Sequence, residues 1–204
     1  MATDYYAIDA ILADTHKLAC TFTLDVAGIG FLEGGNERDI KQYAKAELPF
    51  WMAERLSFHG FTMFPIPAPY SPRVRSALNA SATSISLASL VGANGWWYTF
   101  GRNIYTLLEP PQSTALRATL LKTFIHRLPL IQDLATHYGA SSAASGTAVT
   151  DGGTGSGAAG LVAGEAFMEG MDAEERELFA IGQEGERKVK VWYDTPLGRN
   201  KMGR

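Results

Sequence analysis

The sequence predicts an α+β protein, mostly helical, in which a small β-rich domain comes first and a helical bundle follows. Residues 19–26 alternate between apolar and polar side chains, which is typical of a half-buried strand. A proline-rich passage over residues 65–72 then favours extended backbone. After this passage apolar residues recur at spacings of three and four, which indicates amphipathic helices. We therefore expect a β-rich domain over residues 1–69 and a helical domain over residues 70–204.

The β-rich domain is expected to contain short strands and short helices. A short helix is predicted around residues 8–13. Strands are predicted over residues 19–26, over residues 28–32 after a glycine turn, and over residues 61–64. In the first strand, the residues expected on the buried face are Cys20, Phe22, Leu24 and Val26. Such short strands supply little core, so this domain is expected to need a neighbour for its stability.

A short amphipathic helix over residues 47–58 is expected to join the two domains. Leu48 precedes a proline and is therefore restricted to extended backbone. Pro49 suits the first turn of a helix, where its missing N–H has no partner to lose. Trp51 adds apolar bulk to the helix. We expect Leu48, Pro49 and Trp51 to fix the domain junction.

The helical domain is expected to contain four helices with different end signals. They are a short helix that starts at Pro72 after an N-cap at Ser71, one from about 84 to before Pro110, one from Ser113 to Gly139 with a kink at Pro129, and one after Asp172. The run from Asp172 to Glu175 resembles a capping box in which aspartate replaces Ser or Thr. Gly182 and Gly185 lie on the apolar side of the last helix, which indicates the close approach of another helix. Residues 140–170 are rich in alanine, glycine and serine, and predict a flexible loop.

Composition limits the classes of protein that this sequence can encode. The formal net charge of −3 argues against a large basic surface for nucleic acid. Cys20 is the one cysteine, so the chain contains no internal disulfide and a reducing compartment is expected. The acidic start lacks the apolar segment of a secretory signal, and no window is long and apolar enough to span a membrane. A soluble intracellular protein is expected.

Motifs for catalysis or cofactor binding are not found in the sequence. The histidines have no metal-site spacing, and Cys20 is too isolated to complete a zinc site. The glycines within residues 28–35 are not followed by the Gly-Lys-Ser/Thr of a phosphate loop. We therefore expect no catalytic residue, no metal and no cofactor. The aromatic run 96–98 fits either a helix core or an exposed anchor at a protein interface.

Four segments of the chain resemble, in the same order, those of the third Psf subunit family of GINS, the four-protein replication complex. Residues 47–53, Glu-Leu-Pro-Phe-Trp-Met-Ala, closely resemble its E-L-P-x-W-[LM]-A signature. Residues 8–18 resemble its N-terminal D-x-I-L segment, residues 120–127 its L-L-x-T-F-x-x-R segment, and residues 178–185 its L-F-x-x-G-x-x-G segment. The resemblance covers most of the chain outside residues 140–170, where the insertion departs from shorter relatives.

This resemblance implies a non-catalytic scaffold subunit in the nucleus. Its partners would be the three other GINS subunits and, through the assembled complex, the MCM helicase ring and the Cdc-forty-five protein, with DNA at most an indirect partner and no membrane. Its fold would place a β-rich B domain before a helical A domain. The candidate interface residues are Trp96, Trp97, Phe100, Phe124, Leu128, Leu178, Ile181, Gly182 and Gly185.

Two functions of other classes remain open at this stage. One is an autonomous nucleic-acid-binding module that uses the basic C-terminal tail, with Arg199 and Lys201 as phosphate contacts. The other is an enzyme whose site is assembled from scattered residues, although no motif favours it.

Overall fold

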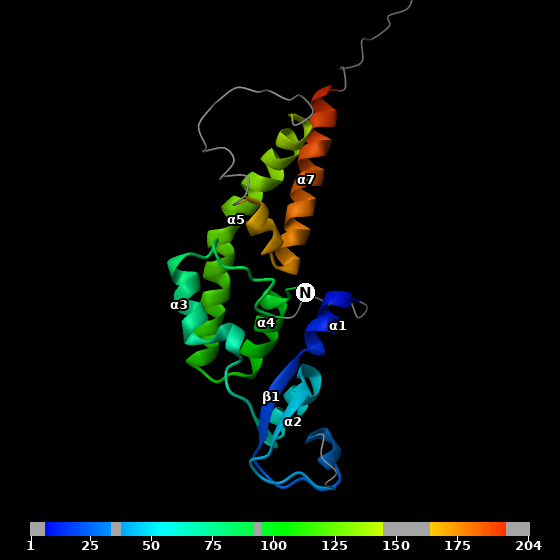
Figure 1. The fold of residues 1–204 in the computed structure, drawn as a ribbon, viewed down its shortest axis with the longest axis vertical. Coiled ribbons are helices and arrows are strands. Elements are labelled where there is room, and N and C mark those ends of the chain that lie inside the picture. The colour runs from blue at the N-terminus through cyan, green and yellow to red at the C-terminus, as the bar shows by residue number, and fades with distance from the viewer. Residues whose placement is uncertain (1–6, 34–37, 92–94, 145–163, 195–204) are drawn as a thin grey trace, which may run out of the picture.

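The computed structural model describes residues 7–33, 38–91, 95–144 and 164–194 of the 204-residue chain. Within these ranges a small antiparallel sheet with short helices comes first and longer helices follow, which confirms the predicted fold class. Figure 1 shows an elongated molecule with the sheet towards one end. The two longest helices, Gln112–Ala144 (α5) and Ala173–Asp194 (α7), lie side by side towards the other end.

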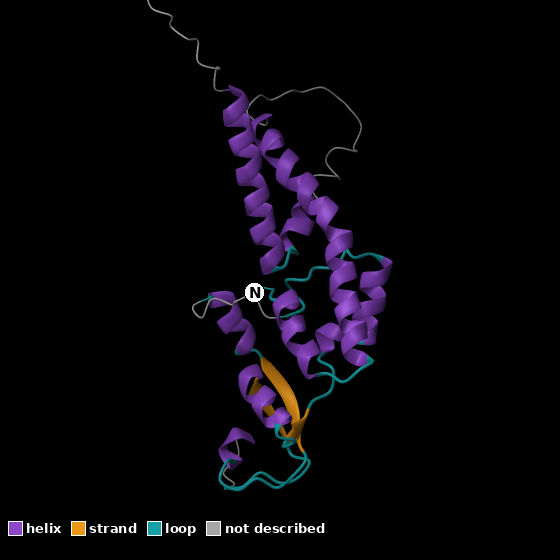
Figure 2. Ribbon diagram, turned by 180° about the vertical axis from the view of Figure 1, so that it is seen from behind, coloured by secondary structure: helices purple, strands orange, loops and turns teal. Residues whose placement is uncertain are grey.

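The sheet has three strands in the order β2-β1-β3, with both outer strands antiparallel to the central one (Figure 2). These strands are Lys17–Phe22 (β1), Lys45–Pro49 (β2) and Thr62–Met63 (β3). The register places Leu18 opposite Leu48. Because side chains alternate along a strand, every second residue turns into the core. The apolar side chains buried in this way are Leu18, Cys20, Phe22, Ala46 and Leu48.

The structure confirms some of the predicted N-terminal elements and corrects others. The helix Ile8–Asp14 (α1) and strand β3 lie where they were expected. The strand expected over residues 28–32 is wrong: a turn at Gly28, with φ of 81°, leads into a 3-10 helix, Gly30–Glu33 (η1). Strand β1 ends at Phe22 rather than at 26, and Leu24 is exposed instead of buried.

The helix predicted over residues 47–58 begins later than expected. Residues 47–49 belong to β2, where buried Leu48 alternates with exposed Glu47. Pro49 keeps extended backbone, with φ of −62° and ψ of 148°, and helix Phe50–Phe58 (α2) starts after it. Pro49 therefore ends a strand in which buried and exposed residues alternate, although proline also suits the first turn of a helix.

The first helical segments after the sheet only partly follow the prediction. The helices are Ala68–Tyr70 (η2), Pro72–Ala80 (α3) and Trp97–Leu107 (α4). Ser71 precedes α3 and Pro72 is its first residue, as predicted. The helix expected from about 84 starts later, at Trp97, because residues 81–91, 95 and 96 have no regular structure. Gly95, with φ of 68°, lies so close to Ala88 that a Cβ would sit 2.5 Å from the Ala88 Cα atom.

Helix α5 is longer than expected and contains Pro129 in its interior. It continues through Gly139 to Ala144, so the predicted end at Gly139 is wrong. The loop expected over residues 140–170 is helical at both ends, because residues 164–169 form a further helix. Phe167 and Met171 are buried against Ile131 of α5 and supply the apolar anchors that this segment needs. Residues 145–163 lie outside the described ranges.

The sheet and the first helices share one hydrophobic core. The ring of Phe100 on α4 lies 4.6 Å from that of His16 and 6.0 Å from that of Phe50, measured between centroids. The Tyr70 hydroxyl donates to the Trp97 carbonyl at 2.7 Å and joins η2 to α4. A boundary between two domains at residues 69 and 70 therefore crosses a continuous core, and it remains a prediction.

Candidate subunit interface

The start of α7 is held by a capping arrangement that also anchors α4. Asp172 precedes the helix, and its carboxylate accepts hydrogen bonds from the backbone N–H groups of Trp97 at 2.6 Å and Glu174 at 3.3 Å. Glu175 in turn accepts one from the Asp172 N–H at 3.2 Å. This reciprocal pattern is the predicted capping box. Since Trp97 is the first residue of α4, one carboxylate caps two helices.

A buried ion pair joins α5 to the same point. Arg127 and Glu175 are both fully buried, with Nε to Oε1 at 2.8 Å and Nη2 to Oε2 at 2.9 Å. The Arg127 Nη1 group donates to the carbonyls of Ala82 at 2.7 Å and Ile85 at 2.9 Å, and the Tyr98 hydroxyl donates to Glu175 at 2.9 Å. Two-point pairing of this kind fixes the orientation of both side chains. Helices α4, α5 and α7 are thus held together by polar contacts that face inwards.

Burial changes the ionisation of this cluster. Desolvation raises the pKa of Asp172 to about 7, against the opposing effect of the two backbone N–H donors. Burial, and then the neighbouring Glu175 carboxylate, raise the pKa of Tyr98, which stays a neutral donor. The cluster therefore serves to position helices, and the surface on their other sides is left to make other contacts.

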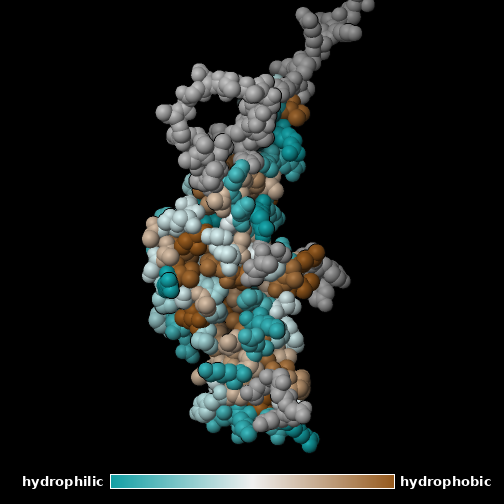
Figure 3. Space-filling model, in the orientation of Figure 1, coloured by the Kyte–Doolittle hydropathy of each residue, from teal (hydrophilic) through white to brown (hydrophobic). Residues whose placement is uncertain are grey.

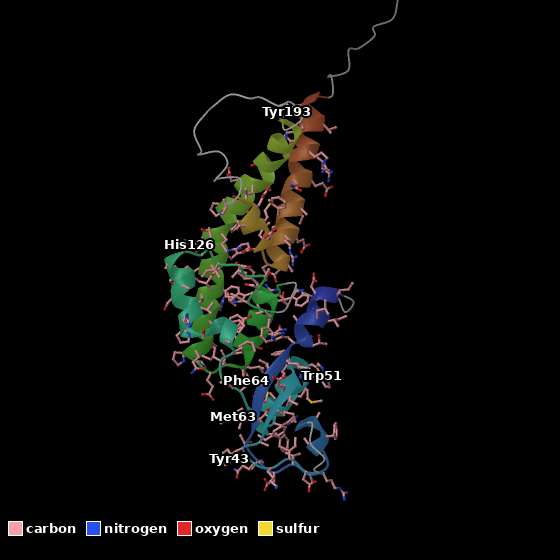
Figure 4. All side chains as sticks on the ribbon, viewed as in Figure 1. Tyr43, Trp51, Met63, Phe64, His126 and Tyr193 are labelled. Atoms are coloured by element: carbon pink, nitrogen blue, oxygen red, sulfur yellow. The ribbon has the colours of Figure 1, made fainter. Side chains whose placement is uncertain are left out.

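The outer sides of α5 and α7 carry apolar side chains that the described part of the chain does not cover. We call this surface the α5–α7 seam; its residues are Leu121, Ile125, Leu178, Ile181, Val189 and Trp192. Leu121 is 59% exposed, Ile181 58% and Trp192 70%. The two residues on α5 are four positions apart, and the four on α7 are separated by three, eight and three positions. These spacings place the residues on one side of each helix. Tyr193 marks the end of α7 farthest from the sheet (Figure 4).

An apolar groove of about 220 Å³ lies between the two helices along this seam. Its lining residues include Leu128, Ile131, Ala135, Leu178, Ile181 and Gly182. At Gly182 the helices approach so closely that a Cβ would lie 2.9 Å from the Ala135 Cβ atom. At Gly185 no atom lies within 4 Å of such a Cβ, so the described part of the chain covers the first glycine and leaves the second open.

The predicted interface residues fall into two groups. Trp96, Trp97 and Phe100 are buried in the core of this chain, so their side chains offer no surface to another one. Phe124 and Leu128 are partly buried, and Leu178, Ile181, Gly182 and Gly185 lie along the seam. The sequence reasoning missed Leu121, Ile125, Val189 and Trp192. Their signal was the spacing of apolar residues along α5 and α7, which places them on one side of each helix.

The residues predicted to fix the domain junction also differ in their burial. Leu48 is buried in the sheet, and Pro49 pairs with Lys17 at the end of β2. Trp51 is 51% exposed and points away from the core (Figure 4), whereas its neighbour Phe50 is buried, with its ring 6.0 Å from that of Phe100. Further apolar side chains are exposed nearby on α1, where Figure 3 shows hydrophobic atoms at the surface.

The basic C-terminal region is only partly described. Lys188 pairs with Glu184 at 2.7 Å and Lys190 with Glu186 at 3.5 Å, so carboxylates on α7 balance these two positive charges. Arg199 and Lys201 lie outside the described residues.

The described residues contain neither a group of metal-ligating side chains nor a helix that could cross a membrane. No group of three or more His, Cys, Asp or Glu side chains there could hold a metal ion. Among the same residues, none of the helices has the length and apolar character needed to cross a bilayer.

A chain with an uncovered apolar seam on two rigidly positioned helices has the properties of a subunit that packs against other chains. Comparison with known proteins agrees with this class. The family model of the PSF3 N-terminal domain matches residues 6–58. The DNA replication complex GINS protein PSF3 of Phaeosphaeria nodorum is 34% identical, over 93% of this chain and 96% of its own.

Two further relatives with that protein name match over most of both chains. The Aspergillus fumigatus protein is 30% identical over 92% of this chain and 95% of its own. The Schizosaccharomyces pombe protein is 30% identical over 94% of this chain and 98% of its own. The chain therefore belongs to the PSF3 family of GINS proteins.

Proposed function

We propose that this chain is a non-catalytic scaffold subunit of the heterotetrameric GINS complex and acts in DNA replication. Family membership supports the complex, and the uncovered α5–α7 seam is the structural observation that carries the scaffold role. Obligate interfaces resemble a protein core cut in half, and an open groove between two apolar stripes has that character. The three other GINS subunits are the partners that would cover it.

Through the assembled complex, the chain would act with the MCM helicase ring and the Cdc-forty-five protein as an accessory factor of the replicative helicase, in the nucleus. The chain's own contribution is rigidity. The Arg127–Glu175 pair holds the relative positions of α5 and α7, and hence the shape of the surface that partners meet. DNA contact would be at most indirect, since charge pairs on α7 already neutralise two of the lysines that lead to the basic tail.

The test is size-exclusion chromatography with light scattering, on the chain alone and co-expressed with the three other GINS subunits. We expect a stable 1:1:1:1 complex, and a chain that self-associates or is poorly soluble without its partners, because its stability depends on their concentration. A monodisperse monomer that ignores the other subunits would contradict the proposal. Salt-dependent DNA binding by that monomer would then favour the nucleic-acid-binding alternative.

A further inference from the structure

A second groove, between α4 and α5, differs from the first in its charge. Its volume is about 370 Å³, and its apolar part includes Tyr105, Leu121 and Phe124. Its polar part is supplied by Arg102, Arg117 and Glu174. It opens on the side of α5 that also carries the exposed Leu121 side chain of the seam.

The hydrogen-bond capacity of this groove favours an anionic occupant. Glu174 is engaged by Arg102, with Nη1 to Oε2 at 2.9 Å and a second contact to Oε1, and by the Thr99 hydroxyl at 2.7 Å. These two opposite charges offset one another. Arg117 is exposed and has no ion pair within the described part of the chain. The groove therefore presents one uncompensated cation beside an apolar surface, with its carboxylate already occupied.

The groove is continuous with the seam along α5. Arg117, Leu121, Phe124 and Leu128 follow one another at spacings of four, three and four, so they share one side of the helix. Leu128 then lines the groove against α7. The strip from residue 117 to residue 135 spans about 27 Å at 1.5 Å per residue. This length matches a long helix lying beside α5.

The elements around the groove favour a helical occupant over an extended one. All of the lining residues belong to the helices α4, α5 and α7, which offer no open strand edge. An extended segment would find no backbone partners there for its own N–H and C=O groups. A helix satisfies those groups internally and needs only side-chain contacts.

We propose that the α4–α5 groove is a docking site for an amphipathic helix of another GINS subunit, which places an apolar side chain between Tyr105 and Leu121 and a carboxylate on Arg117. This inference rests on the proposed function, and it adds the position and the chemistry of one contact. The carboxylate would pair with the guanidinium at two points, which sets the register of the partner helix on α5.

The first experiment places the photo-reactive residue benzoylphenylalanine at position 121 of the chain within the four-subunit complex. Irradiation followed by mass spectrometry identifies the residue that is joined to it. We expect a residue on a helix of a partner subunit, with an Asp or Glu within one helical turn. The second experiment compares Arg117→Glu with the matched control Arg73→Glu, which makes the same charge change at an exposed position on α3 outside the groove.

We expect Arg117→Glu to weaken assembly about tenfold relative to Arg73→Glu. Replacing the partner's carboxylate by lysine should then restore assembly of the Arg117→Glu chain. The inference is overturned if the wild-type complex forms but position 121 reaches no partner helix, or if the two variants assemble equally well. Failure of the wild-type chains to assemble would instead contradict the proposed function.

Discussion

Arg127 determines how three helices meet, although it makes no contact with solvent. A single guanidinium binds Glu175 of α7 at two points and the carbonyls of Ala82 and Ile85 in the irregular segment before α4. Its Cζ atom also lies 4.4 Å from the centre of the Phe167 ring. A buried charge is tolerated only when its partners are all in place, so the stability of the chain depends on the groups that surround Arg127.

Replacing Glu175 by glutamine should strongly destabilise the chain. The variant keeps the side-chain shape and leaves the Arg127 charge buried without its counter-ion, which costs about 3–5 kcal/mol. The matched control is Glu184→Gln, which removes an exposed carboxylate paired with Lys188 and should cost less than about 1 kcal/mol. Urea denaturation followed by far-UV circular dichroism measures both. Equal free energies of unfolding for the two variants would show that the buried pair contributes no more than a surface pair.

Asp172 should make stability depend on pH with the opposite sign to an ordinary ion-paired carboxylate. Its pKa is raised from 3.8 to about 7 in the folded chain, so between these values the folded chain holds a proton that the unfolded chain releases. Its contribution is therefore fully present below pH 3.8 and is lost as pH rises to about 7, at up to about 1.4 kcal/mol per pH unit.

The measurement for this prediction is the difference in unfolding free energy between the wild type and Asp172→Asn across that pH range. Asparagine keeps an acceptor for the Trp97 N–H group and cannot titrate. The difference should shrink as pH rises towards 7. A difference that is constant with pH, or one that grows, would mean that the two N–H donors outweigh burial.

At the scale of the element, local sequence signals predicted where helices start. They did not predict the outcome where the same residues suit both a helix and a strand. The Ser71–Pro72 start of α3 and the capping box at Asp172 are confirmed, because each depends on neighbouring residues alone. Residues 47–49 also suit a helix start, and their pairing with β1 decides the outcome in favour of a strand. The helix at 164–169 is anchored by Phe167 against α5, a distant contact that composition cannot indicate.

For the candidate site, the sequence predicted the apolar sides of the helices but not which of their residues are exposed. Apolar stripes on α5 and α7 were visible in the spacing, and so was the glycine side of α7. The stripes do not show which residues the chain covers itself. Trp97 and Leu121 both read as apolar helix positions, yet the first is fully buried and the second is exposed. Only the tertiary arrangement separates core from seam.

The two glycines of α7 should respond oppositely to the same substitution. Gly182→Ala places a methyl group 2.9 Å from the Ala135 Cβ atom, and the resulting displacement of α7 from α5 should cost about 1–3 kcal/mol. Gly185→Ala meets open space and removes a flexible residue from a helix, which should stabilise the isolated chain by about 1 kcal/mol. Thermal unfolding of the chain alone tests both. The prediction fails if Gly182→Ala is as stable as the wild type.

At the scale of the whole molecule, the β-rich part and the helical part are bound by a common core. Phe100 of α4 contacts the rings of both His16 and Phe50, and Tyr70 lies between the two parts. Polar contacts add to this: the Asn103 amide donates to Asp14 at 2.9 Å, which joins α4 to the end of α1. The seam, in contrast, lies along α5 and α7.

A fragment containing residues 1–69 alone should therefore fail to fold. It retains the three short strands and loses Tyr70 and Phe100, which close its core, and chains below about 70–80 residues rarely have stability to spare. We expect a poorly dispersed amide NMR spectrum and no cooperative thermal transition. Adding a fragment of residues 70–204 is the control, because restoring the missing side chains in trans should recover dispersed signals if the shared core is the cause. A fragment that melts cooperatively without this addition would show instead that the predicted boundary at residues 69 and 70 separates two independent domains.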